Sequence, residues 1–133
     1  MGSINLARLV NAPFEDDAHI DLEALEDLVT TAVRMMDNVV DVSNFPLEAQ
    51  SHEARAKRRI GLGVTGLADA LIMCGARYGG SRAVELTETW MHRLQRAAYL
   101  ASVNLAKEKG AFTLLDKDKY LCGETIQDMD EDV

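Results

Sequence analysis

The sequence contains few of the residues that usually indicate a disulfide framework, a nucleic-acid surface or a membrane span. Its two cysteines, Cys74 and Cys122, stand far apart in 133 residues, which disfavours a zinc or redox motif. A net charge of −8 argues against nucleic acid or an anionic membrane as the main partner. No apolar run reaches membrane-spanning length, and no signal or transit peptide is evident. We therefore expect a soluble, reduced, cytoplasmic protein.

Aromatic residues are also scarce, at 5% of the chain, although apolar residues as a whole make up 47%. The chain is long enough for one domain with a single core, which aliphatic side chains and alanine must fill. Residues 3–6 are compatible with a short strand, followed by a turn at 11–13. From Leu22 to about Val40, apolar residues recur every three or four positions, which predicts an amphipathic helix with Asp21 as its N-cap.

The C-terminal part of this helix carries residues that do not suit a helix end. Asp37, Asn38 and Asp41 lie near the end of the helix, where the helix dipole favours basic side chains. We therefore expect the helix to fray into residues 42–44.

Three more helices are predicted further along the chain. Pro46 suits a first helical turn, so a polar, alanine-rich helix is expected over Leu47–Arg59. A short helix over residues 67–73 is closed by Gly75. After the loop at residues 78–80, Ser81 is suited to cap a long helix that ends at Gly110. The tail beyond it ends in residues 128–133, which are rich in acids and are expected to fray.

The long helix has apolar residues on more than one side. Its main stripe comprises Val84, Trp90, Met91, Leu94, Ala97, Ala98, Ala101 and Leu105. Leu86, Leu100 and Val103 lie off that stripe, so we expect neighbours on both sides of the helix. We interpret Trp90 and Met91 as core residues.

Basic residues at the end of the second helix lead into a glycine-rich turn. Arg55, Lys57, Arg58 and Arg59 are explained by the helix dipole and by solvation, with an anion site as the alternative. Gly61, Gly63 and Gly66 then spell G-x-G-x-x-G.

This glycine pattern meets the requirements of a dinucleotide site only in part. Such a site needs a buried strand before the first glycine and an acidic residue about 20 positions further on. Glu85 stands at about that distance, but the basic triplet 57–59 precedes Ile60, where the strand would run. We therefore favour a structural role, in which the glycines allow a sharp turn or a close approach of strand and helix.

The remaining polar residues form no catalytic pattern. The histidines His19, His52 and His92 are scattered and are interpreted as surface residues rather than metal ligands. The acids Glu23, Glu26 and Asp27 are interpreted as a solvated helix face. No serine stands in a nucleophile-elbow context.

Four stretches of sequence are informative together. They are Gly2–Leu6, which reads GSINL; Asp37–Val42, DNVVDV, followed by Pro46; Arg58–Val64, RRIGLGV, followed by Gly66–Asp69, GLAD; and Glu108–Phe112, EKGAF, after the long helix. In this order and at these separations they resemble the catalytic large chain of ribonucleotide reductase, and most closely its adenosylcobalamin-dependent class. Each motif alone is weak, but four in register extend the resemblance over essentially the whole chain.

The resemblance implies an α-rich α/β fold. Residues 1–133 would be a single segment of the ten-stranded α/β barrel of ribonucleotide reductase, incomplete at both ends. The segment would consist mostly of helices, with one or two short strands at Ser3–Leu6 and Ile60–Val64. These strands and the helices outside them would supply barrel scaffold.

The resemblance also implies a reaction, in which a thiyl radical starts the conversion of ribonucleotides to deoxyribonucleotides. In the family the radical cysteine lies in an Asn-x-Cys-x-Glu motif, followed by a reducing cysteine two residues before the position of Met1. We expect neither cysteine in this segment, and Gly2, Ser3, Ile4 and Asn5 are expected nearest the active site. Cys122-Gly123-Glu124 mimics the radical motif, but Tyr120 replaces its asparagine and it comes after Gly2 rather than before it. We interpret Cys122 as an ordinary residue.

The expected partners follow from the same resemblance. The partner is the remainder of the reductase chain or a complementing subunit, and the ribonucleotide substrate and adenosylcobalamin belong to the full enzyme only. No metal and no cofactor is expected on this segment alone, which we expect to be inactive and prone to self-association. The alternative is a stand-alone helical interaction module derived from the reductase, without catalysis.

Overall fold

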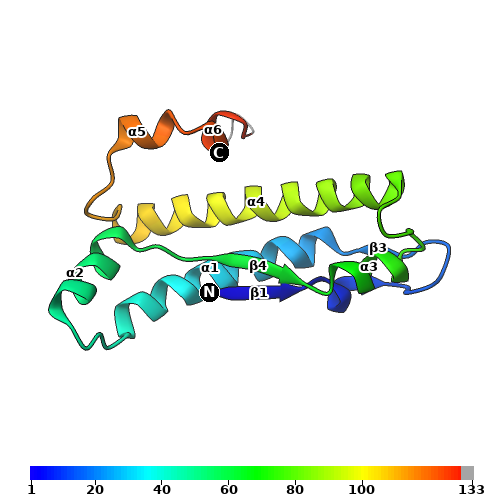
Figure 1. The fold of residues 1–133 in the computed structure, drawn as a ribbon, viewed down its shortest axis with the longest axis horizontal. Helices are drawn as coiled ribbons and strands as arrows, with labels where there is room; N and C mark the ends of the chain where they lie inside the picture. The colour runs from blue at the N-terminus through cyan, green and yellow to red at the C-terminus, as the bar shows by residue number, and fades with distance from the viewer. Residues whose placement is uncertain (130–133) are drawn as a thin grey trace.

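A computed structural model describes residues 1–129, which form two long helices packed beside two short parallel strands (Figure 1). The elements in chain order are β1 (Gly2–Asn5), the 3₁₀ helix η1 (Leu6–Leu9), β2 (Val10–Asn11), β3 (His19–Ile20), α1 (Leu22–Val42), α2 (Glu48–Lys57), β4 (Leu62–Thr65), α3 (Leu67–Met73), α4 (Ser81–Lys109), α5 (Lys117–Leu121) and α6 (Glu124–Gln127). The α-rich fold with few short strands is therefore confirmed.

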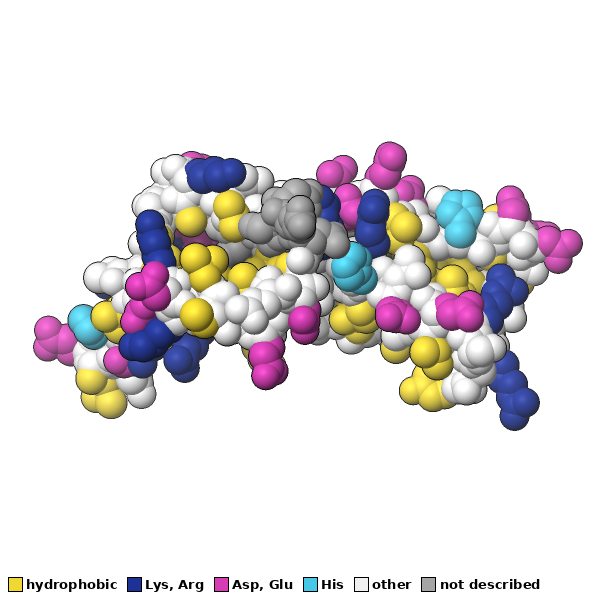
Figure 2. Space-filling view, turned by 90° about the horizontal axis from the view of Figure 1, so that it is seen from above, with side chains coloured by type: hydrophobic (Ala, Val, Ile, Leu, Met, Phe, Trp, Pro, Cys, Tyr) yellow, Lys and Arg dark blue, Asp and Glu magenta, His cyan; other side chains and the backbone are white. Residues whose placement is uncertain are grey.

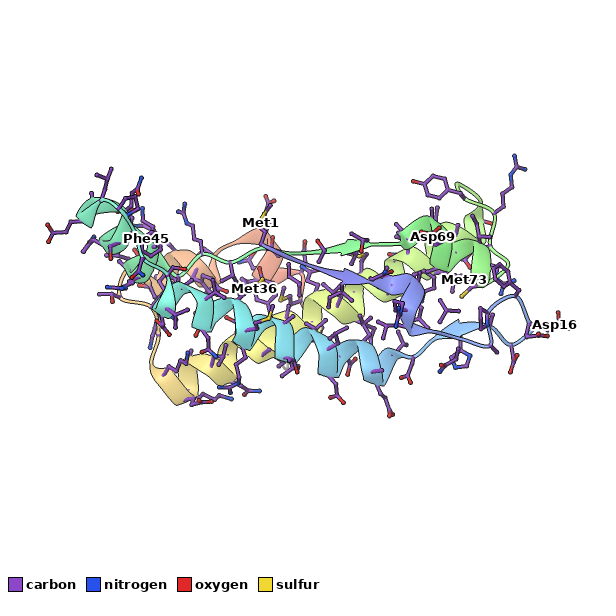
Figure 3. All side chains as sticks on the ribbon, turned by 90° about the horizontal axis from the view of Figure 1, so that it is seen from below. Met1, Asp16, Met36, Phe45, Asp69 and Met73 are labelled. Atoms are coloured by element: carbon purple, nitrogen blue, oxygen red, sulfur yellow. The ribbon has the colours of Figure 1, made fainter. Side chains whose placement is uncertain are left out.

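Strands β1 and β4 pair in parallel, although 56 residues separate the end of one from the start of the other (Asn5 to Leu62). The intervening chain forms the small antiparallel pair β2–β3 and then α1 and α2. Helices α1 and α4 lie side by side on one side of the strand pair, as Figure 3 shows from below. The strand pair is thus backed by a layer of two helices.

The core is built mainly from aliphatic side chains and alanine, as the scarcity of aromatic residues predicts. Leu6, Leu25 and Val29 are fully buried, and Trp90 is the one large aromatic among the buried described residues. In contrast, several large apolar side chains remain exposed, and Figure 2 shows hydrophobic groups between the charged ones on the face that carries the tail. No described helix combines the length and the apolar character that crossing a bilayer requires.

Several local predictions are confirmed. Asp21 caps α1 by accepting a hydrogen bond from the Ala24 amide at 2.9 Å. Helix α3 spans the expected residues and is followed by Gly75 at φ +66. Helix α4 ends at Lys109, and Gly110 follows at φ +88. These features depend on neighbouring residues only, which explains why they are visible in the sequence.

Other local predictions are wrong. Ser81 is the first residue of α4 rather than its cap, because Gly80 holds the cap position and no side chain caps the helix. Helix α2 begins at Glu48 after Leu47, so Pro46 lies outside it. The strands are shifted by one or two residues from the expected Ser3–Leu6 and Ile60–Val64. The end of the tail that was expected to fray lies mostly outside the described residues, at 130–133.

The long helix α4 differs from its predicted stripe at two positions. Val84 and Met91 are exposed, whereas the rest of the stripe from Trp90 to Leu105 is buried or half-buried. Only Trp90 of the expected pair is therefore a core residue. The residues off the stripe, Leu86, Leu100 and Val103, are half-buried, and Figure 1 draws α1 and the strand pair below α4 and α5 above it.

Candidate functional site

The strand pair has two unlike faces. In the parallel register Gly2 lies beside Leu62 and Ile4 beside Val64, and Ile4 is buried under the helices. Because side chains alternate along a strand, Ser3 and Asn5 point to the opposite face, where their partners are Gly63 and Thr65. We call these four residues the polar face.

The polar face is unusual for parallel strands, which are normally covered and apolar on both sides. Ser3, Asn5 and Thr65 are exposed, and Gly63 is half-buried. The Ser3 hydroxyl lies 3.8 Å from the position that a Cβ on Gly63 would take, which confirms that the two share a face. Small polar side chains beside a glycine leave room for a ligand or for other chain above the strands.

The carboxyl ends of β1 and β4 lie close to Gly66. Asn5 accepts a hydrogen bond from the Ala7 amide through Oδ1 at 3.2 Å and so caps η1. Gly66 adopts φ +69, and a Cβ there would lie 2.5 Å from Asn5 Oδ1. Ligands of parallel sheets bind beyond the carboxyl ends of the strands, so this end of the polar face is the candidate functional site.

The structure also explains the glycine pattern. A strand does occur there, but β4 lies between Gly61 and Gly66 instead of ahead of the first glycine. The G-x-G-x-x-G residues therefore do not form the strand–loop–helix turn of a dinucleotide site. The close approach of Gly66 to β1 and η1 confirms the structural role that we favoured.

The residues expected nearest the active site are divided between the two faces. Ser3 and Asn5 belong to the polar face, whereas Ile4 is buried and a Cβ on Gly2 would lie 3.3 Å from Met36 Sδ. Chemistry at this site is therefore open only to Ser3 and Asn5 among the four.

The remaining chemical candidates lie elsewhere. Cys74 is in the core, where burial raises the pKa of its thiol, and Cys122 is exposed in the tail. All three histidines are exposed, as expected. Among residues 1–129 no three His, Cys, Asp or Glu side chains gather closely enough to hold a metal ion.

A cluster of charged residues at the other end of the molecule was not expected. It joins the C-terminal ends of α1, α2 and α4, which meet at one end of the molecule in Figure 1. Arg58 donates from Nε to Asp37 Oδ1 at 2.8 Å and from Nη1 to Asp41 Oδ1 at 2.6 Å. Lys109 donates from Nζ to Asp37 Oδ2 at 2.7 Å and to Asn38 Oδ1 at 2.8 Å. We call these five residues the charge cluster.

The charge cluster bears on two predictions. Helix α1 ends at Val42 and Ser43 follows in an extended conformation, close to the expected fraying at residues 42–44. However, Asp37, Asn38 and Asp41 suit this helix end, because cations from two other elements pair with them there. Arg58 is not simply solvated; it ends α2 in the left-handed conformation at φ +45 and turns its side chain back to α1. The signal in the sequence was the excess of acids at one helix end and of bases at another.

The alternative interpretation of the basic residues 55–59, an anion-binding site, can be judged for Arg58 and for Arg55. Arg58 is held by carboxylates of its own chain. Arg55 lines an open groove together with Glu48, Ser51, His52, Ala56 and Thr113. Because Glu48 shares this groove, the charge around Arg55 is mixed, and no anion site is assigned there.

The contacts of the charge cluster shift its pKa values. Burial alone would raise the pKa of Asp37, but hydrogen bonds from Arg58 and Lys109 outweigh it and hold the pKa below its ordinary value. The hydrogen bonds from Arg58 lower the pKa of Asp41 to about 2. Hydrogen bonds to Asp41 raise the pKa of Arg58, and those to Asp37 raise the pKa of Lys109. The two acids and the two bases of the cluster are therefore charged at neutral pH.

We expect acid to destabilise the fold between about pH 4 and pH 2. A carboxylate whose pKa is lowered by folding stabilises the folded state above its unfolded pKa, and that stabilisation is lost as the pH falls through the folded pKa. For Asp41 these values are 3.8 and about 2. Urea denaturation at a series of pH values should show a smaller dependence on pH for Asp41→Asn than for the unchanged protein.

Asp16→Asn, in the exposed loop before β3, is the matched control and should leave the pH dependence unchanged. If Asp41→Asn and the unchanged protein lose stability in parallel below pH 4, the charge cluster is not the source of the acid sensitivity.

Comparison with known proteins places this geometry in context. The model of the ribonucleotide reductase barrel domain matches residues 1–132. A vitamin B12-dependent ribonucleoside-diphosphate reductase of Mycobacterium tuberculosis is 42% identical over 120 residues, which cover 90% of this chain and 17% of that protein. A protein of the same name from Thermoplasma acidophilum is 39% identical over 112 residues, or 84% of this chain and 14% of that protein.

A ribonucleoside-diphosphate reductase subunit alpha of Chlamydia muridarum is 34% identical over 120 residues, which cover 90% of this chain and 11% of that protein. The chain therefore spans less than a fifth of the length of each of these relatives.

Proposed function

Because this chain belongs to the ribonucleotide reductase family through its barrel domain, we propose that it supplies two adjacent strands and the outer helices of a reductase barrel. In this proposal the polar face lines the interior of the barrel beside the active site. The complete enzyme would convert ribonucleotides to deoxyribonucleotides by thiyl-radical chemistry. The radical and reducing cysteines would come from outside residues 1–133.

The observation that carries this proposal is the contrast between the two faces of the strand pair. In an α/β barrel the helices cover the outside of the strands and the other face looks inward. Here α1 packs against one face, while Ser3, Asn5 and Thr65 are exposed on the other. A strand pair of this kind suits a barrel whose interior is a polar reaction site better than it suits an isolated domain.

The proposed cofactor of the complete enzyme is adenosylcobalamin, which would generate the radical when bound. The names of the Mycobacterium and Thermoplasma relatives include vitamin B12, and their identities to this chain, 42% and 39%, exceed the 34% of the Chlamydia subunit. No donor set for this cofactor is evident among the described residues. This chain would contribute the shape and polarity of the barrel wall beside the active site.

A split-enzyme experiment tests the proposed function. The chain is co-expressed with the two pieces of the Mycobacterium tuberculosis relative that flank the matched segment. We expect the three pieces to purify together and to reduce a ribonucleoside diphosphate when adenosylcobalamin and a dithiol reductant are added. The control is Ile4→Asp, which places a charge in the buried face of β1 and should prevent assembly.

Two results would decide against this proposal. If the three pieces do not assemble, the alternative of an independent helical module is favoured. If they assemble without any turnover that depends on adenosylcobalamin, the assignment to the cobalamin class is wrong.

A further inference from the structure

Helix α1 carries a second apolar stripe whose large side chains the described residues leave exposed. The stripe comprises Leu28, Ala32, Met35, Val39 and Val42. Its large side chains are all exposed, from 42% at Leu28 to 76% at Val42. The residues follow one another at intervals of four, three, four and three, which is the spacing of a helix seam that packs against another helix. We call this stripe the α1 seam.

The neighbours of α1 locate the seam in the molecule. Ion pairs to α4 mark one flank of the helix, through Arg34 to Glu108 and Asp37 to Lys109. Met36 marks the side that faces the strands, since its sulfur lies near Gly2. At about 100° per residue, the centre of the seam lies roughly 150° around the helix from the α4 flank. The seam therefore faces away from α4, along the helix layer.

We propose that the α1 seam binds a helix of the reductase polypeptide outside the matched segment, which extends the helix layer beyond α1. This inference rests on the proposed function and names the partner surface that it requires. The helix would run beside α1 in the same way that α4 does on the opposite flank. Its apolar side chains would interlock with the seam, and its other face would be polar.

The strands favour the same partner. Helix α1 packs against β1, and among the described residues β1 pairs with β4 only, so its other edge is open. An open strand edge beside an apolar helix stripe is the junction at which another strand and its helix fit together. Most of the length of the relatives lies outside the match, 83% in the Mycobacterium protein, and so provides such a unit.

A second copy of this chain fits the observations less well. Two copies joined through their α1 seams would cover the apolar stripe but would provide no strand for the open edge of β1. The reductase partner covers both features at once.

The test compares the same substitution at two exposed valines. Val39→Glu places a charge in the seam, and Val84→Glu places one on α4, away from it; the two side chains are 51% and 59% exposed. Binding of each variant to the two flanking pieces of the Mycobacterium relative is measured by titration. We expect Val39→Glu to weaken binding about tenfold or more and Val84→Glu to leave it within about twofold. Val42→Glu, at a more exposed seam position, should repeat the first result, and circular dichroism should show that all variants are folded.

Each outcome has a distinct meaning. If the unchanged chain binds and all variants bind equally well, the seam inference is wrong and the proposed function stands. If the unchanged chain does not bind, both fail. If the chain alone forms a dimer that Val39→Glu abolishes, the seam belongs to a second copy and the inference is overturned.

Discussion

Gly66→Ala is expected to lower the free energy of unfolding by about 2–5 kcal/mol, from two separate causes. Gly66 has φ +69, a conformation that L-residues rarely adopt. An added Cβ would also lie 2.5 Å from Asn5 Oδ1, 3.2 Å from Ala7 Cβ and 3.3 Å from the Ala7 amide nitrogen. The Asn5 side chain can move only by giving up its cap on η1, and the Ala7 backbone cannot move independently.

Gly75→Ala separates these two causes. Gly75 has a similar φ of +66, but no atom lies within 4 Å of its added Cβ, so only the backbone strain applies, about 1 kcal/mol. Urea denaturation followed by the fluorescence of buried Trp90 measures both variants. Equal losses in the two variants would show that the contact between Gly66 and β1 does not constrain the fold.

The second large effect is expected for Arg58→Ala, at about 2–4 kcal/mol. Removing the Arg58 guanidinium leaves Asp37, whose side chain is only 13% exposed, with Lys109 as its remaining cationic partner. Arg58 also ends α2 and precedes β4 by a few residues, so its guanidinium fixes where the chain enters the strand. We therefore expect β4 to lose protection from hydrogen exchange before α1 and α4 do.

Arg34→Ala is the matched control for Arg58→Ala. Arg34 forms a bidentate ion pair with Glu108, from Nη1 to Oε1 at 3.0 Å and from Nη2 to Oε2 at 2.6 Å. Both side chains are, however, about half exposed. Exposed pairs contribute little to stability, so this variant should unfold close to the unchanged protein in urea. Similar losses for the two variants would mean that burial at the charge cluster does not matter.

The identity of the family was accessible from the sequence through short motifs, and the structure explains why they are informative. The GSINL stretch forms β1 and the first residue of η1, and RRIGLGV with GLAD supplies the C-cap of α2, most of β4 and the start of α3. DNVVDV and EKGAF supply Asp37, Asp41 and Lys109 to the charge cluster. The four motifs are thus the residues that hold the strand pair and the helix ends together.

Some errors of the sequence analysis share one physical cause. Asp37, Asn38 and Asp41 were judged unsuited to the end of α1 from the helix dipole, which is a local argument, whereas the cations that pair with Asp37 stand 21 and 72 residues away. Exposure of Val84 and Met91 was likewise invisible, because periodicity shows that a helix face is apolar without showing what lies opposite.

The sequence by itself determined the local features: the Asp21 cap, the start of α3, the end of α4 at Gly110 and the aliphatic composition of the core. These follow from hydrogen bonds and side-chain spacing within one or two turns. Only the tertiary structure decided the parallel register of β1 with β4, the division of Gly2–Asn5 between two faces, the charge cluster and the open α1 seam. Each of these depends on which distant segments meet, and that is set by the simultaneous packing of α1 and α4 against the strands rather than by any local pattern.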